Sequence, residues 1–556
     1  MNKLKKTLAN PFFYLLIFVL FNWILLFPVT KLAPPDFYKY YFAGERLIKG
    51  SMNLRFIPPL FPFSLYIFGK FLSLFLSSYN PFITASKLLS LFAGLGIIFF
   101  SYKFLREYTG SFSLLGTVFI IISPFFLKFL SFPSTDIVFL FFVMASFYFF
   151  LAKKDFLLFF SVLLGALTRY EGILLIMILF IYFFDFKKAK NYFKLLLFLV
   201  VSAPIVYLFY YKFGHRFVQK VELVTQTKSF LFFIYHPKQL FYIVYSGILN
   251  FIPNKTPVLF HWVVLYFLIV FLIIGLLLLF RNNLKLAVSI LLYELIFAFG
   301  KGYIFGNSYA IIPGEHNLRR FLSFVFVFYL LSFVGLYGLL RYLRKSLGDK
   351  EFVFLRYFIY FILGVLVFSR FLITAKFILI SLIFILPLLL IFLRSLKFGK
   401  IEKAILIILL FSFFTNYYFK TYKKGYKYIY STPNKGAYAI AEWINNNSTL
   451  KKAAVFSNLI MIRFYLKRNI NMLYFYSKEE SIYKDRKKLE VFIVGELKKQ
   501  KTRYVAFDWY LNPIDRPGEV ELKKFLFKEI KEQENFILKE GLIFKSQPVA
   551  AVLCLR

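Results

Sequence analysis

The sequence predicts an α-helical membrane region with many spans, followed by a smaller soluble α/β domain. Of the 556 residues, 60% are hydrophobic, and they include 82 Phe and 40 Tyr. A soluble domain averages about 45–50% apolar residues, so this chain carries more apolar side chains than a soluble fold can bury. The long apolar runs stop near residue 419, and charged residues are denser after that point. A membrane region and then a soluble domain explain both observations.

The two predicted domains are residues 1–419 and residues 420–556. The first contains 42 of the 69 basic residues but only 13 of the 27 acidic residues, whereas the second contains 27 basic and 14 acidic residues. The second segment is long enough to form a core of its own. Within it we expect helices at 439–444, 479–500 and 519–533 and buried strands at 453–456 and 502–508.

Fourteen apolar runs are candidates for crossing a membrane, because a bilayer core of roughly 30 Å needs about 20 helical residues. The pair 156–168 and 170–184 is short and is expected to form a tight helical hairpin around Arg169. The runs are 11–29, 58–78, 82–104, 112–131, 135–152, 156–168, 170–184, 193–212, 258–280, 284–300, 319–340, 351–370, 374–393 and 402–419.

The positive charges between the runs decide how many of them span. Lys3, Lys5 and Lys6 precede the first run, which lacks a small-residue cleavage site, so we expect a signal anchor with a cytoplasmic N terminus. If 58–78 lies in the outer interface instead of crossing, the basic loops all fall on the cytoplasmic side. This arrangement leaves about thirteen spans, with the soluble domain outside the cell membrane.

The same topology explains the net charge of +42. In a soluble protein that excess would suggest a nucleic-acid partner, but here it belongs to cytoplasmic loops. The single cysteine, Cys554, excludes an intrachain disulfide framework. Four histidines leave little material for a His-rich metal centre, so no metal site is expected.

Acidic residues are scarce in the membrane region, and six of them fall at or near its outer face. They are Asp36, Glu45, Asp136, Glu171, Glu222 and Glu315. Most of the others lie among basic residues at cytoplasmic ends, as solvated loop charges. Glu294 falls within a span, where a hydrogen bond between helices is favoured over catalysis.

The outer acids have recognisable surroundings, although each also has a structural interpretation. Asp36 follows Pro34-Pro35 and begins a short helix that Gly50 ends, so it is either an N-cap or a functional carboxylate. Asp136 is likewise a possible cap, and Glu171 a possible structural ion-pair partner of Arg169. Glu315 and His316 precede Arg319-Arg320, two outer arginines that suggest an anion nearby.

Several of these segments together resemble the GT-C superfamily of lipid-linked-sugar glycosyltransferases. The similar groups are the protein O-mannosyltransferases and the lipid A aminoarabinose transferases, of the family 39 and 83 kind. The resemblance implies a GT-C-like fold with about 13 transmembrane helices, interfacial helices in the first outer loop (30–81) and an outer soluble domain. The segments are Asp36 to Gly50 with Tyr40, Ile57 to Pro62, Ser134-Thr135-Asp136, Gly165 to Gly172 and Asn317 to Phe321.

The resemblance implies transfer of a sugar from a polyprenyl phosphate to a lipid, glycan or protein acceptor, with inversion. Such a reaction needs a carboxylate to deprotonate the acceptor and fixed positive charge on the lipid phosphate. We expect Asp36 to be the general base and Arg169 to bind the donor phosphate, followed by Arg319, Arg320 and Arg55. The supporting residues are Asp136, Glu171, Glu315, Tyr40 and His316. No cofactor is required, and a divalent ion is not implied.

The main alternative is a polytopic transporter or flippase of lipid-linked sugars. A carrier of that kind should show internal repeats and polar interruptions near the middle of the membrane, and the sequence shows neither convincingly. The outer loop 213–257 is longer than a plain connector and is either a lid or an ordinary loop. The soluble domain either captures the acceptor or supports the membrane region.

Overall fold

The computed structural model describes the chain in segments. They are residues 37–50, 57–76, 81–110, 135–184, 189–211, 258–300, 322–343, 432–447, 451–456, 471–473, 485–508 and 519–555, the last with short breaks, together with scattered single residues. The chain forms two compact units, one of Met1–Lys31 and Lys39–Gly425 and the other of Leu32–Tyr38 and Tyr426–Arg556.

The first long described segment is the helix α3 (Phe37–Ile48), followed by α4 (Leu60–Ser73). Gly50 has a φ of 73°, a left-handed conformation that glycine adopts without strain, and the helix ends there as the sequence predicts. The two helices touch closely at Gly44, where a Cβ atom would overlap the carbonyl oxygen of Pro62. Glycine is therefore required at this crossing.

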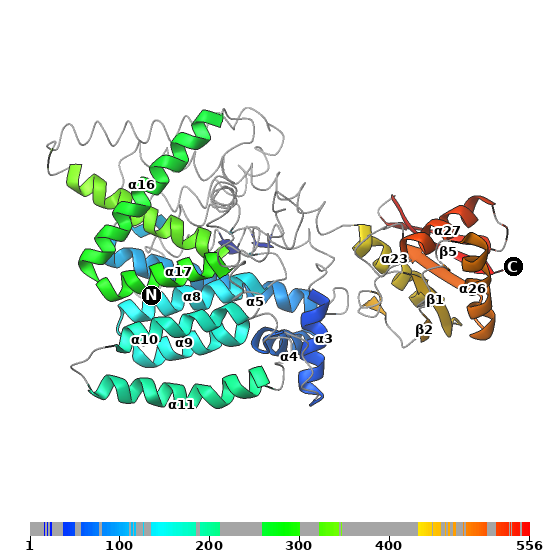
Figure 1. Ribbon diagram of the computed structural model, residues 1–556, viewed down its shortest axis with the longest axis horizontal. Coiled ribbons are helices and arrows are strands. Elements are labelled where there is room, and N and C mark those ends of the chain that lie inside the picture. Colours follow the sequence, from blue (N-terminus) through cyan, green and yellow to red (C-terminus); the bar gives the residue numbers. More distant parts are fainter. Residues whose placement is uncertain are drawn as a thin grey trace, which may run out of the picture. The chain divides into compact units, whose positions relative to one another are not determined.

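The helical unit continues with long apolar helices that pack side by side (Figure 1). α5 packs against α4 and α8, and α8 packs against α9. Gly96 of α5 makes room for the ring of Phe141 on α8. The helices are α5 (Pro81–Thr109), α8 (Thr135–Leu151), α9 (Asp155–Thr168), α10 (Ile176–Phe183), α11 (Ala189–Tyr211), α16 (Val258–Asn282) and α17 (Leu284–Gly300).

Between α9 and α10 lies a 3₁₀ helix, η3 (Tyr170–Leu175), so the predicted hairpin is present but its return arm starts with a tighter helix. The turn is compact because Gly172 packs on the backbone of Gly165. At the other end of the hairpin, Asp155 accepts a hydrogen bond from Tyr182 of α10 (2.6 Å) and pairs with Lys194 of α11. These contacts hold α9, α10 and α11 together.

A further helix covers Leu322–Leu343 and crosses α16 at glycines. A Cβ atom on Gly275 would overlap the carbonyl oxygen of Leu331, and one on Gly335 would overlap that of Phe271. Two backbones can approach this closely only where both lack side chains, which is a common way for membrane helices to associate.

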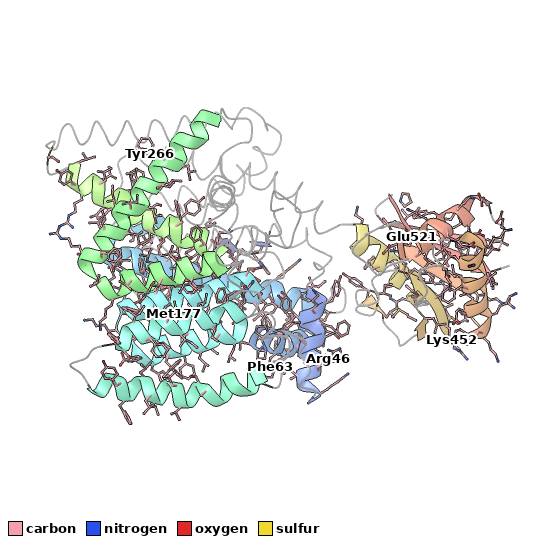
Figure 2. All side chains as sticks on the ribbon, in the orientation of Figure 1. Arg46, Phe63, Met177, Tyr266, Lys452 and Glu521 are labelled. Atoms are coloured by element: carbon pink, nitrogen blue, oxygen red, sulfur yellow. The ribbon has the colours of Figure 1, made fainter. Side chains whose placement is uncertain are left out.

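Three described helices are long and apolar enough to cross a membrane, namely Pro81–Thr109, Leu265–Asn282 and Leu322–Leu343. Helix α4 has 14 residues, about 21 Å of helix, and is shorter than a bilayer core. Large apolar side chains are exposed on several helices, including Phe63 of α4 and Tyr266 of α16 (Figure 2), and lipid contact is a common reason for such exposure.

The second unit contains a five-stranded mixed sheet with the order β2-β1-β3-β5-β4. β1 pairs in parallel with β2 and β3, whereas β5 runs antiparallel to both β3 and β4. The strands are β1 (Lys452–Phe456), β2 (Asn471–Leu473), β3 (Tyr504–Asp508), β4 (Phe536–Phe544) and β5 (Gln547–Leu555). The helices are α23 (Thr432–Asn446), α26 (Arg486–Lys499) and α27 (Glu519–Glu532).

Helices cover both faces of this sheet. Val505 of β3 lies in the core formed with α26 and α27, and its neighbour Tyr504 contacts the ring of Trp443 on α23 (5.9 Å between centroids). Adjacent residues of a strand point to opposite faces, so α23 covers the face away from α26 and α27. The three expected helices and two expected strands of this unit are present. The helix expected from residue 479 instead begins at Arg486, after the cap Asp485, and β2, β4 and β5 were not anticipated.

Candidate active site

Arg169 occupies the turn between α9 and η3 with an extended backbone (φ −144°, ψ 147°). Its amide still donates to the carbonyl oxygen of Gly165 (3.2 Å), so the break in the helix is only one residue long. The side chain is 15% exposed. A guanidinium buried to this degree among apolar helices requires compensating charge and hydrogen bonds.

Glu171 supplies part of that compensation. Nε of Arg169 donates to Oε2 of Glu171 (3.1 Å) and Nη2 donates to Oε1 (3.0 Å), which is the bidentate geometry that matches guanidinium to carboxylate. The Glu171 side chain is 7% exposed. The ion pair with Arg169 that the sequence suggested for Glu171 is thus present.

Asp136 binds the other end of the guanidinium. Nη1 of Arg169 donates to Oδ1 of Asp136 and also to the hydroxyl of Thr135 (3.4 Å). Asp136 lies in the first turn of α8, where the positive end of the helix dipole stabilises a carboxylate. Together the contacts from Glu171, Asp136 and Thr135 use four of the five guanidinium N–H groups.

The surroundings of this ion-paired group are aromatic. The guanidinium carbon of Arg169 lies 5.9 Å from the ring centroid of Phe139, within range of a cation–π interaction. Phe139 is one helical turn after Asp136, so both side chains face the same way from α8. Phe139 was not among the predicted site residues. Its position one helical turn after Asp136 was the sequence signal that could have identified it.

Tyr40 of α3 reaches the same group of residues. Its hydroxyl lies 3.4 Å from that of Thr135, and its ring packs edge-on against Phe61 of α4 (5.4 Å). On the same helix, burial and the charge of Glu45 raise the pKa of Tyr41 to about 12. Tyr40, Thr135, Asp136, Arg169 and Glu171 form the cluster referred to below as the Arg169 cluster.

A second polar group lies on α17. Glu294 is 7% exposed, and its Oε1 accepts a hydrogen bond from the hydroxyl of Ser323 (3.4 Å) on the helix Leu322–Leu343. The hydrogen bond between helices expected for Glu294 is therefore present. The neighbouring Tyr293 packs its ring against Phe147 of α8 (5.9 Å) and Phe297 (5.7 Å).

The remaining predicted site residues lie outside the described residues. They are Asp36, Arg55, Glu315, His316, Arg319 and Arg320, and the outer loop 213–257 is outside as well. Within the described part of the chain, one group of carboxylates is close enough together to hold a metal ion. It consists of Glu529, Glu532 and Glu534 in the second unit, and exposed acidic residues are often grouped in this way without an ion.

The fold of the chain is similar to that of a protein whose structure has been solved. The chain aligns with the crystal structure of ArnT from Cupriavidus metallidurans bound to undecaprenyl phosphate, with a TM-score of 0.55, 12% identity and coverage of 97% of this chain and 98% of that one. The apo structure of the same protein aligns with a TM-score of 0.53 and 13% identity over 97% of each chain. At this identity the likeness shows the fold, and it confirms the resemblance to the aminoarabinose transferases at that level.

No protein-family model matches the chain, and no curated protein sequence matches it either. The likeness is thus one of fold.

Proposed function

We propose that the protein is an integral-membrane glycosyltransferase that moves a hexose or pentose from a polyprenyl-phosphate donor to a lipid, glycan or protein acceptor. The reaction takes place at the outer face of the cell membrane and inverts the anomeric carbon. The observation that carries the proposal is the Arg169 cluster, a charged group at helix ends within a fold like that of a protein crystallised with undecaprenyl phosphate.

In the proposed reaction, Asp36 removes the proton from the acceptor hydroxyl or amine. The acceptor atom attacks the anomeric carbon from the face opposite the phosphate, and the bond between that carbon and the phosphate oxygen breaks. The leaving group is a polyprenyl phosphate, already a weak base, so no general acid is needed. Fixed positive charge on the phosphate oxygens stabilises the charge that develops there. The chemistry requires no cofactor.

The contacts of Arg169 refine its proposed role. Because Glu171, Asp136 and Thr135 use four of its five N–H groups, one N–H of Nη2 is available for a phosphate oxygen. We therefore assign Arg169 two functions, to fix Asp136 and Glu171 and to contribute part of the phosphate charge. Arg319, Arg320 and Arg55 supply the rest in this proposal.

We further propose that the membrane region has about thirteen spans, a cytoplasmic N terminus and the second unit outside the membrane. The asymmetry of basic residues between the apolar runs supports this orientation. Single cysteines introduced at residue 2 and at residue 540 of a Cys554→Ser variant test it, because the native cysteine is partly exposed in the second unit. We expect a membrane-impermeant maleimide added to intact cells to label the second position and not the first.

The function is tested with the purified protein in lipid nanodiscs, radiolabelled undecaprenyl-phosphate sugars and lipid, glycan and peptide acceptors. We expect label to move to one acceptor class, and Asp36→Asn to abolish the transfer. Transfer at the wild-type rate in both Asp36→Asn and Arg169→Ala would contradict the assigned site. In sealed vesicles, movement of the donor between leaflets without transfer would instead support the transporter or flippase alternative.

A further inference from the structure

Glu294 is an ionisable side chain within a membrane helix, and the reaction proposed above gives it no role. One oxygen, Oε1, accepts a hydrogen bond from Ser323 (3.4 Å). The other oxygen, Oε2, is buried and has no hydrogen-bond partner among the described residues, and the same is true of the hydroxyl of Tyr293. Buried polar atoms are nearly always hydrogen-bonded, and ionisable residues inside membrane helices commonly mark substrate sites.

These polar atoms belong to one group. Ser323 lies near the Tyr293 hydroxyl as well as near Glu294, although outside hydrogen-bond geometry for the tyrosine. Glu294, Tyr293 and Ser323 thus bring a carboxyl group and two hydroxyl groups together from α17 and the helix Leu322–Leu343. We refer to these three residues as the Glu294 group.

The Glu294 group lies beside the proposed active site. Helix α17 packs on η3, the element that contains Glu171, and on α8, the helix that contains Asp136. The Tyr293 hydroxyl is close enough to Arg169 and Glu171 for both charges to act on it. A continuous stack of rings joins the two places, because Phe139 under Arg169 stacks on Phe297, which stacks on Tyr293.

The sequence also places the Glu294 group close to residues of the proposed donor site. Ser323 follows Arg320 by three residues, and Arg319 and Arg320 are proposed to bind the donor phosphate. The sugar is bonded directly to that phosphate. Groups that bind the sugar ring must therefore lie within a few ångströms of the groups that bind the phosphate.

We propose that the Glu294 group binds the hydroxyl groups of the sugar carried by the polyprenyl-phosphate donor. The carboxyl oxygen and the tyrosine hydroxyl have no hydrogen-bond partner in the part of the chain that the structure describes. They match adjacent sugar hydroxyls, each of which donates and accepts a hydrogen bond. The Glu294 group contains none of the positive charge that a phosphate site requires, and a lipid chain would leave both polar atoms unsatisfied. This inference rests on the proposed function and names the residues that recognise the sugar.

The proposal is tested by comparing the affinity for undecaprenyl phosphate alone with the affinity for each of the undecaprenyl-phosphate sugars used in the transfer assay; the sugar that the wild-type protein binds most tightly is then used for the variants. Both affinities are measured in nanodiscs for the wild-type protein and for Glu294→Gln, Tyr293→Phe and Ser323→Ala. The matched control is Ser289→Ala, which changes a buried serine of the same helix whose hydroxyl is satisfied locally by the carbonyl oxygen of Lys285 (2.8 Å).

We expect Glu294→Gln and Tyr293→Phe to weaken binding of the sugar-bearing donor about 10- to 100-fold, the range expected for one lost hydrogen bond to a charged or buried group. Binding of undecaprenyl phosphate alone should stay at the wild-type level, and Ser289→Ala should change neither affinity. The affinity of these variants for a sugar-bearing acceptor should also equal that of the wild type, because the proposed ligand of the Glu294 group is the donor sugar.

Three results would overturn the proposal. The first is an equal loss of affinity for both lipids together with a lower unfolding temperature, which would make Glu294 a link between helices only. The second is a loss confined to a sugar-bearing acceptor. The third is a wild-type protein that binds the lipid equally well with and without sugar. Failure of transfer with retained discrimination between the two lipids would contradict the proposed enzyme activity and leave the sugar site supported.

Discussion

Gly172 packs directly on the backbone of Gly165, so closely that a Cβ atom on Gly172 would overlap the Gly165 carbonyl oxygen. The contact closes the hairpin between α9 and η3 and fixes the turn that contains Arg169. The same Gly165 carbonyl accepts the amide of Arg169 (3.2 Å). The position of the guanidinium thus depends on two glycines that have no side chain to contribute to the site.

We expect Gly172→Ala to lower the unfolding temperature, with a cost of about 1–3 kcal/mol typical of overpacking. Activity should fall as well, since Arg169 moves with the turn. Thermal unfolding in detergent measures the effect. Gly495→Ala is the control, because its Cβ would meet no atom within 4 Å on helix α26, and alanine favours a helix. Equal unfolding temperatures for Gly172→Ala and the wild type would show that the turn adapts.

Glu171→Gln should destabilise the protein by about 3–5 kcal/mol, because it leaves a largely buried guanidinium with one carboxylate fewer. The control is Glu45→Gln, which breaks an exposed pair with Lys49 (2.7 Å) on α3 and should have little effect on stability. Denaturant unfolding of the two variants separates a buried ion pair from a surface one. A similar small change in both would argue that Glu171 is dispensable.

Thr135→Val should reduce transfer without reducing the unfolding temperature by more than the control Thr109→Val. Thr135 joins Tyr40 and Arg169 through one hydroxyl, whereas the hydroxyl of Thr109 is satisfied by the carbonyl of Leu105 (2.8 Å) in its own helix. Thr135→Ser should restore the rate. A serine variant as slow as valine would show that packing, and not the hydroxyl, is responsible.

Gly335→Leu should separate α16 from the helix Leu322–Leu343, since any side chain there meets the backbone of Phe271. We expect loss of folded protein from the membrane fraction, detected by size-exclusion chromatography in detergent. Leu277→Ala, on an exposed part of α16, is the comparison and should leave the yield unchanged. A monodisperse Gly335→Leu protein at wild-type yield would contradict the close crossing.

In the second unit, Lys523 and Asp508 form a fully buried ion pair (2.7 Å, both side chains 2% exposed). Lys523→Met should cost about 3–5 kcal/mol by leaving the carboxylate without this ammonium. Lys528→Met, which loses the more exposed pair with Glu532 (3.1 Å), should cost about 1 kcal/mol or less. Chemical unfolding followed by Trp fluorescence compares them, and equal midpoints would refute the difference in burial.

The helices of the first unit could be predicted from long apolar runs in the sequence, as for α5, α8, α16 and α17. The pairing of Arg169 with Glu171 was also foreseeable, because the two residues are two positions apart. Asp136 was expected among the supporting residues as a group that orients the arginines or the sugar. Its contact with Arg169, 33 residues later, could not be derived from spacing, since it depends on how α8 packs against α9. Tertiary packing sets that geometry, and local sequence patterns do not encode it.

The strands β4 and β5 were missed for a different reason. β4 lies at the edge of the sheet, contains Lys539, Glu540 and Gly541, and has irregular register with β5, so it lacks a strand-like alternation. β5 is almost entirely apolar, a pattern that does not distinguish a strand from a buried helix. The proposed base, Asp36, lies outside the described residues, and its assignment still rests on the sequence.

The two ion pairs of Arg169 differ in what must be assembled before each can form. Glu171 lies in the same hairpin, so its carboxylate can neutralise the guanidinium as soon as α9 and η3 have formed. Asp136 can join only after α8 has packed alongside. During biogenesis the hairpin can therefore enter the membrane with its arginine already paired, which lowers the cost of inserting a charge into hydrocarbon.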